Sequence, residues 1–253
     1  VEAKARELHV SGWHILFPQA QASTVLAENG LMQRSGCQYQ WFNHSFRDFD
    51  HYLEKLSSRK RKNIRKERAQ VADAGIHFEV LEGPQVSPDL WQTYYDFYRS
   101  TYFVRGRHPY LNLSFFQRIG RVMPEALVLV MALRDEEYIA GALSFKGADT
   151  LYGRYWGCLE EYRFLHFETC YYQGIDYCIR QSLARFDSGA QGEHKIQRGF
   201  EPVLTCSNHW IADPRFSQAI ARFLEEEESY ITEYLQRAQN YLPFKKTGLE
   251  ISE

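Results

Sequence analysis

The alternation of apolar and polar positions divides the chain into short strands and amphipathic helices. Three consecutive segments, residues 126–135, 138–147 and 150–160, are rich in branched and aromatic side chains, and the turns RDEEY and GADT separate them. This pattern is typical of an antiparallel meander. Periodicity and capping signals predict helices at 1–11, 23–29, 45–74 (with Ser45 as N-cap), 88–101, 114–122, 168–184 and from about residue 214. Further strands are expected at 13–17, 37–42, 76–83, around Phe186 and up to Ile211.

A repeat relates a segment near the N-terminus to the last strand. GLMQRSGCQYQWFN, residues 30–43, and GFEPVLTCSNHWIA, residues 199–212, align without a gap. The aligned pairs are Gly30 and Gly199, Cys37 and Cys206, Trp41 and Trp210, and, further back, Phe17 and Phe186. The repeat predicts two copies of one structural unit. We expect residues 1–81 to hold the C-terminal part of a first unit, with a long basic helix, and residues 82–253 to hold a complete second unit with a C-terminal helix.

Composition narrows the classes of protein that this chain could be. Its 253 residues are 44% hydrophobic and 25% charged, as in a soluble globular protein, and the net charge of -2 predicts no general attraction to nucleic acid or anionic membranes. No apolar run approaches the roughly 20 residues of a membrane helix. The five cysteines are odd in number and form no CxxC pair, which favours reduced thiols and a cytoplasmic location. No metal-binding motif is present, so we expect no metal site.

The stretch GAQGEHKIQRGFEP, residues 189–202, concentrates charge between glycines. When the two copies are aligned, neutral or apolar residues of the first copy correspond to four charged or titratable residues of the second: Glu193, His194, Lys195 and Arg198. Packing of the scaffold that both copies share therefore does not explain these four side chains. His194 or Glu193 could act as a general base, Lys195 could stabilise an oxyanion or phosphate, and Arg198 could clamp a phosphate or carboxylate. The alternative is a solvated charged loop.

A second cluster lies in LYGRYWGCLEEYRFLHFE, residues 151–168. Strand alternation predicts that Tyr152, Arg154 and Trp156 share one face. There Arg154 would be either a stacked structural cation or a ligand clamp, with the two aromatic residues as substrate contacts. His166 is a substrate-binding candidate or a packed capping residue, and Glu168 is a catalytic candidate if burial raises its pKa.

The order of predicted elements resembles the GNAT acyltransferase fold, with Gly30–Leu31 and Gly199–Phe200 where GNAT chains carry Gly-Phe before their last strand. A tandem pair of such units resembles the Fem family, whose members transfer aminoacyl groups from aminoacyl-tRNA to peptidoglycan precursors. The stretches LYGRYWGC, FLHFETCYYQGIDYCI and GAQGEHKIQRGFEPVLTCSNHW are more similar still to the bacterial FemAB-like, or peptidoglycan biosynthesis/recognition, family.

This resemblance implies an α/β (α+β) fold: a GNAT-like mixed sheet flanked by helices, in tandem, with the first unit only partly present. Lys195 matches a lysine implicated at the acyl centre of Fem-like enzymes. The glycine pair with which GNAT enzymes usually hold acyl-CoA is missing from LEEYRFLHFETC, which disfavours acetyl-CoA as donor.

The segment RKRKNIRKER within the predicted helix 45–74 is strongly basic. It predicts either a contact with tRNA phosphates or a solvated helix end. The candidate contact residues are Arg59, Lys60, Arg61, Lys62 and Arg65.

Two hypotheses of different class follow. The first is an acyl or aminoacyl transferase that uses aminoacyl-tRNA or acyl-CoA as donor and a small-molecule or peptide amine as acceptor, an acyl-CoA-dependent N-acetyltransferase being one variant. The second is a non-catalytic module on the same fold that recognises a peptidoglycan-type or peptide ligand. No resident cofactor is expected in either case.

Overall fold

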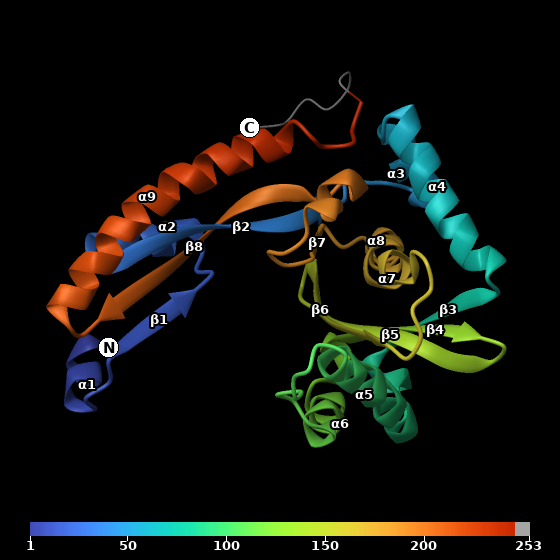
Figure 1. Cartoon of the computed structure of the whole chain (residues 1–253), viewed down its shortest axis with the longest axis horizontal. Coiled ribbons are helices and arrows are strands. Elements are labelled where there is room, and N and C mark those ends of the chain that lie inside the picture. Colours follow the sequence, from blue (N-terminus) through green and yellow to red (C-terminus); the bar gives the residue numbers. More distant parts are fainter. Residues whose placement is uncertain (246–253) are drawn as a thin grey trace. The chain divides into compact units, whose positions relative to one another are not determined.

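A computed structural model describes residues 1–245, which contact clustering divides into two compact units (Figure 1). The first unit combines Val1–Tyr39 with Glu201–Leu242. The second comprises Gln40–Phe200 together with the segment that begins at Pro243. We describe each unit separately.

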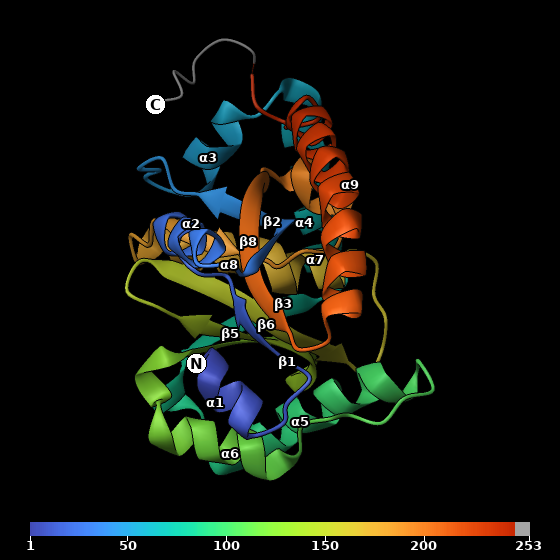
Figure 2. The ribbon, with the colours of Figure 1, turned by 90° about the vertical axis from the view of Figure 1, so that its left-hand side faces the viewer.

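The first unit is a three-stranded part of the sheet with helices packed on it. Its helices are α1 (Glu2–Glu7), α2 (Ala20–Glu28) and α9 (Pro214–Gln239), and its strands are β1 (Gly12–Leu16), β2 (Met32–Phe42) and β8 (Glu201–Ile211). The strand order is β1-β8-β2, with Gly12 opposite Ile211 in the antiparallel β1–β8 pair. Figure 2 shows α9 running alongside β8. The buried Ser23 hydroxyl fixes α2 to β8 by donating to Asn208 Oδ1 at 2.8 Å.

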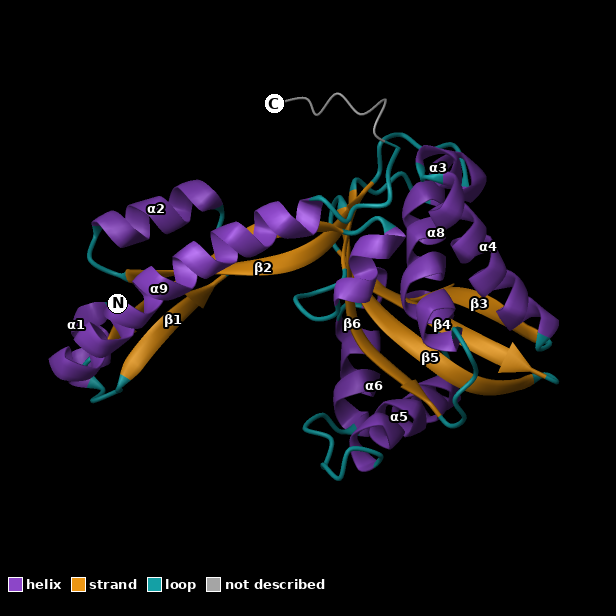
Figure 3. Ribbon diagram, turned by 45° about the horizontal axis from the view of Figure 1, so that its top comes forward, coloured by secondary structure: helices purple, strands orange, loops and turns teal. Residues whose placement is uncertain are grey.

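The second unit continues the sheet from the end of β2 (Figure 3). Its order is β2-β7-β6-β5-β4-β3, formed by β3 (Ile76–Glu82), β4 (Leu127–Arg134), β5 (Glu137–Lys146), β6 (Thr150–Cys158) and β7 (Arg185–Asp187). The meander β4-β5-β6 is antiparallel, as predicted. The β6–β7 pair is parallel and spans only three residue pairs, from Thr150 opposite Arg185 to Tyr152 opposite Asp187. Beyond Tyr152, therefore, β6 continues without β7 beside it.

Helices cover both faces of this sheet (Figure 1). On one face, α5 (Pro88–Phe103) and α6 (Leu113–Val122) bury an aromatic core that includes Trp91, Tyr94 and Phe116. On the other face lie α4 (Ser58–Asp73), α7 (Leu165–Phe167), a π-helix (Glu168–Tyr172) and α8 (Gln173–Arg180). Gly157 lets α5 approach β6, because a Cβ there would lie 1.9 Å from the Phe97 carbonyl oxygen.

Two predicted helices are interrupted. The helix expected at 45–74 is α3 (Phe49–Lys55) followed by α4, and Asp48 rather than Ser45 caps α3 by accepting from the His51 amide at 2.7 Å. The break arises because Leu56 bridges to Phe244 and the Ser57 amide donates to Pro243 O, so this backbone pairs elsewhere. The helix expected at 168–184 begins as the π-helix and ends at Arg180.

The internal repeat has a structural counterpart. β2 and β8 each contain 11 residues, and Cys37 and Cys206 occupy the same position in them, as do Trp41 and Trp210. Each strand follows a glycine with a left-handed backbone, Gly30 at φ 89° and Gly199 at φ 78°. The compact units nevertheless do not divide at residues 81 and 82, because β8 pairs with β1 in the first unit. The predicted copies 1–81 and 82–253 refer to a repeat in the sequence and not to compact units. The division of the chain into these two copies stays a prediction.

Candidate functional site

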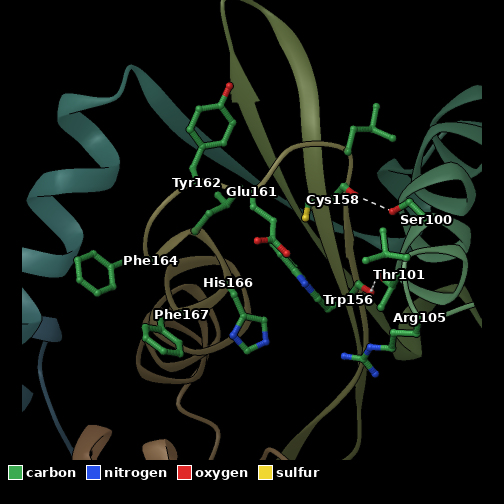
Figure 4. A pocket seen from close by; sticks show the side chains of 13 residues that line it. Ser100, Thr101, Arg105, Trp156, Cys158, Glu161, Tyr162, Phe164, His166 and Phe167 are labelled. Carbon is green, nitrogen blue, oxygen red and sulfur yellow. Dashed lines mark hydrogen bonds between the residues drawn. The ribbon is translucent and has the colours of Figure 1, made fainter.

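Two adjoining cavities open on the second unit. The larger, about 500 Å³, lies between the C-terminal half of α5, the end of β6, the loop 159–164 and α7 (Figure 4). The smaller, about 130 Å³, lies where β6 and β7 part, against the π-helix. Trp156 and His166 line both. These two side chains therefore belong to both cavities.

The C-terminal end of β6 is held by hydroxyl groups of α5. The Ser100 hydroxyl donates to Cys158 O at 2.6 Å, and the Thr101 hydroxyl donates to Trp156 O at 3.0 Å (Figure 4). These bonds satisfy carbonyls at the part of β6 that has no β7 partner. They fix the wall that the two cavities share.

A bulge in β6 corrects the expected arrangement of Tyr152, Arg154 and Trp156. Tyr155 pairs with Leu143 but Gly153 pairs with Ser144, so Arg154 is the extra, bulged residue. Tyr152 lies opposite Phe145 and Trp156 opposite Ala142, which are on opposite faces of β5 by strand alternation. The prediction of one shared face is therefore wrong. Arg154 and Trp156 still line the smaller cavity, whereas Tyr152 does not.

His166 is the titratable group at the junction of the cavities. Its ring lies 5.3 Å from the centroids of both Trp156 and Tyr171. Burial lowers the pKa of His166 to about 4, and the nearby charges of His194, Lys195 and Arg198 act in the same direction. The imidazole is therefore neutral at neutral pH and can accept a proton.

Lys195 lies behind the wall of the smaller cavity. The side chain is buried, and its ammonium donates to Ser188 O and, at 3.3 Å, to Gly189 O. The ammonium also lies 6.0 Å from the centroid of Tyr171, which lines the smaller cavity together with Ser188. Burial lowers the pKa of Lys195 to about 8, against the opposing effect of Asp187.

His194 faces the same group of side chains from the short 3-10 helix Glu193–Arg198. Its Nε2 is 3.0 Å from the Tyr171 hydroxyl, and its ring lies 6.2 Å from His166. Burial, then Arg198 and Lys195, lower the pKa of His194. Glu193 is exposed at the start of this helix and lines neither cavity.

Arg198 and Glu168 form buried ion pairs with α4. Arg198 donates to Glu67 Oε2 at 2.7 Å and lies 3.5 Å over the Phe167 ring. Glu168 accepts from Arg68 at 2.9 Å and from Gln173 at 2.8 Å. Burial raises the pKa of Glu168, while Arg68 opposes that shift. Both charges are engaged within the protein, in contacts that hold the π-helix and the 3-10 helix against α4.

The basic helix uses its two faces differently. Ile64, Glu67, Arg68 and Val71 point inward to the core and the ion pairs. Among the candidate RNA contacts, Lys60 donates to Gln197 at 2.9 Å, Arg65 pairs with Asp50 at 2.9 Å, and Arg61 is half-buried. Arg59 and Lys62 are exposed, and neither side chain has an ion pair within residues 1–245.

Two charged residues of the larger cavity, Arg105 and Glu161, were not singled out by the sequence. They come from the loop after α5 and the loop after β6, and only the fold brings these loops together. In Figure 4 their side chains and that of His166 point into the same space. The basic-aromatic run RGRHPY was the sole available signal for Arg105.

Three features are absent from the described residues. The cysteines are free thiols, no group of three potential ligands for a metal ion was found, and no helix is both long and apolar enough to cross a membrane. These statements apply to residues 1–245.

Comparison with known proteins relates the chain to one family and one fold. A family model described as FemAB-like, peptidoglycan biosynthesis/recognition, matches residues 1–246. The structure titled FemX is similar over 87% of this chain and 77% of its own, with a TM-score of 0.61 and 14% identity. A search of curated protein sequences found no match.

Two further solved structures are similar in fold. The C-terminal domain of a putative lysylphosphatidylglycerol synthetase from Agrobacterium fabrum is similar over 90% of this chain and 75% of its own, with a TM-score of 0.60 and 13% identity. L-PGS from Bacillus licheniformis is similar over 83% of this chain and 72% of its own, with a TM-score of 0.57 and 10% identity. The family resemblance and the GNAT-like mixed sheet predicted from the sequence are thus confirmed.

Proposed function

The chain belongs to the FemAB-like family of peptidoglycan biosynthesis/recognition proteins, and from this premise we propose that it transfers an acyl or aminoacyl group to an amine. One observation carries the proposal: two cavities on one face of the second unit share the side chains of Trp156 and His166. The smaller cavity, where β6 and β7 part, receives the acyl end of the donor. The larger cavity receives the amine acceptor.

The reaction uses His166 as a proton carrier. The acceptor ammonium first releases one proton to solvent. The resulting amine nitrogen attacks the acyl carbonyl carbon, and the neutral imidazole takes the second proton that this nitrogen must lose. The bulge at Arg154 leaves a backbone N–H outside the β5–β6 ladder, and this donor stabilises the developing oxyanion. The imidazolium passes its proton to the leaving oxygen or sulfur as the tetrahedral intermediate collapses. Burial, reinforced by nearby cationic side chains, favours this proton release because it lowers the pKa of His166.

Lys195 assists from behind the wall rather than by direct contact with the donor. Its buried ammonium binds the Ser188 and Gly189 carbonyls and so fixes the segment that follows β7. It also places positive charge near Tyr171 and His166. We therefore assign Lys195 an electrostatic and positioning role, with Arg154 as the side chain that contacts the donor.

Aminoacyl-tRNA is the donor that the surface favours. Arg59 and Lys62 offer cations to RNA phosphates on the exposed face of α4. The loop before α7 carries Glu160 and Glu161 and no glycine, so it opposes the pyrophosphate of acyl-CoA. A tRNA-binding assay tests this: Arg59→Ala/Lys62→Ala should weaken binding and reduce its salt dependence by about two charges.

A recognition module without catalysis is the second candidate, and a specific observation favours it. Glu168 and Arg198, two expected site charges, are committed to ion pairs with Arg68 and Glu67. These two residues are therefore not available for proton transfer or donor binding, which fits a site that binds a ligand without turnover.

Mass spectrometry distinguishes the candidates. The protein is incubated with a muramyl-pentapeptide precursor and either aminoacyl-tRNA or acetyl-CoA, and the product mass is measured. A transferase adds one aminoacyl residue (from aminoacyl-tRNA) or one acetyl group (from acetyl-CoA) to the precursor. His166→Gln reduces the rate, whereas His77→Gln, on the exposed part of β3, does not. Binding of the precursor with no product from either donor would overturn the transferase proposal and support the recognition module.

A further inference from the structure

The larger cavity carries two charged side chains of opposite sign that the protein itself does not neutralise. Arg105 and Glu161 line it, and neither side chain has a hydrogen bond or ion pair within residues 1–245. Arg198, Glu168 and Arg68 differ in this respect because each is paired, whereas Arg154 of the smaller cavity has no such partner within residues 1–245 either. Both residues are exposed to solvent, so a ligand that brought both a negative and a positive group could form an ion pair with each of them.

The remaining wall is aromatic. Trp156, Tyr162, Phe164 and Phe167 line the same cavity as the two charges, together with His166 (Figure 4). Aromatic faces attract an ammonium through their π-electrons and exclude water from apolar chain atoms. A volume of about 500 Å³ admits an amino acid together with a further residue or a sugar attached to it.

We propose that this cavity binds a group in which an ammonium and a carboxylate lie on the same carbon, as at the free end of an amino acid. Arg105 holds the carboxylate through a bidentate pair, and Glu161 attracts the ammonium. His166 lies beside the bound amine, in position to take its proton. The inference rests on the proposed function in one respect, because it identifies this ligand as the acceptor class of that reaction.

Two sources could present this chemistry: a free amino acid, or a diamino acid side chain carried by a peptide. Calorimetry distinguishes them with four probes. The probes are L-norleucine, L-norleucinamide (which lacks the carboxylate), N-acetyl-L-norleucine (which lacks the ammonium) and a peptide containing meso-diaminopimelate, whose side chain ends in an amino and a carboxyl group. Tighter binding of the peptide identifies a peptide-borne acceptor, and equal or weaker binding identifies a free amino acid.

The wild-type protein should bind norleucine at least tenfold more tightly than either analogue. Arg105→Ala should abolish the preference over norleucinamide, and Glu161→Gln should abolish the preference over N-acetylnorleucine. Two variants serve as controls because neither residue lines the cavity: Arg107→Ala, from the same loop as Arg105, and Glu137→Gln, at the exposed start of β5. Thermal unfolding confirms that all variants fold.

The outcomes separate this inference from the proposed function. Absence of norleucine binding, equal affinity for all three small probes, or equal losses in the control variants would overturn the inference even if the protein transferred acyl groups. Selective binding with no transfer from any donor would overturn the proposed reaction and leave the ligand class standing.

Discussion

Replacement of Arg198 by alanine tests whether the charged motif after β7 is part of the packed structure. The Arg198 side chain is 7% exposed, its partner Glu67 is 16% exposed, and their closest atoms are 2.7 Å apart. Glu67 also accepts from the Tyr172 hydroxyl. The substitution would leave a carboxylate largely buried without its cation and would empty the space over Phe167.

The magnitude follows from these contacts. Removal of one partner of a buried pair costs about 3–5 kcal/mol. A loss of 1 kcal/mol lowers the melting temperature of a protein this size by roughly 2–4 °C, so Arg198→Ala should melt about 6–20 °C below the wild type. Circular dichroism measures the shift. The control is Arg180→Ala. The Arg180 side chain is 55% exposed and forms a long ion pair of 3.8 Å with Asp176 of the same helix. Such surface pairs contribute about 0.3–0.5 kcal/mol to stability.

A double variant separates charge from packing. Glu67→Gln/Arg198→Met removes both charges and keeps most of the side-chain volume, so it should be more stable than Arg198→Ala. If Arg198→Ala melted within 2 °C of Arg180→Ala, the pair would contribute no more than a surface contact, and our description of the motif as packed structure would be wrong.

Three further predictions follow. The pKa of His166 falls from its ordinary 6.5 to about 4 on folding, so between these pH values the unfolded chain binds a proton that the folded chain does not. The free energy of unfolding should therefore decrease as the pH drops from 6.5 to 4. Urea titrations should show a smaller decrease in His166→Gln than in the wild type. Acetyl-CoA should bind more weakly than about 1 mM, and calorimetry that gave a micromolar constant (about -8 kcal/mol) would contradict the absence of a phosphate cradle. Gly157→Ala should destabilise the protein by about 1–3 kcal/mol in denaturant titrations, since its Cβ would overlap the Phe97 carbonyl, and wild-type stability would show that α5 can move aside.

The sequence was most informative where local patterns decide structure. The turns around Asp135 and Asp149 predicted the meander, and the register of Cys37 with Cys206 predicted two equivalent strands. The break at Leu56 was missed because it depends on Phe244, which is remote in sequence. The bulge at Arg154 was missed for a related reason: alternation assumes an uninterrupted ladder.

The candidate site was predicted only in part. The type of a residue indicates the chemistry it could perform, but not whether its side chain lines a cavity or is already paired within the protein. His166, Arg154 and Trp156 do line a cavity. Lys195 was considered as a contact for an oxyanion or phosphate. Its side chain is buried, so Lys195→Ala would leave the carbonyls of Ser188 and Gly189 without their donor. Arg105 and Glu161 lie more than 50 positions apart, and only the close approach of α5 to β6 places them on one cavity.

The rate of aminoacyl transfer to a muramyl-peptide precursor by His166→Gln, relative to wild type, tests the central claim most directly. The claim is that His166 carries the proton between acceptor and leaving group where the two cavities meet. The account predicts that kcat/KM falls at least 100-fold, about 2.7 kcal/mol, while the melting temperature stays near that of His77→Gln. Transfer by His166→Gln at the wild-type rate would contradict the assignment of this residue and of the junction as the reaction centre.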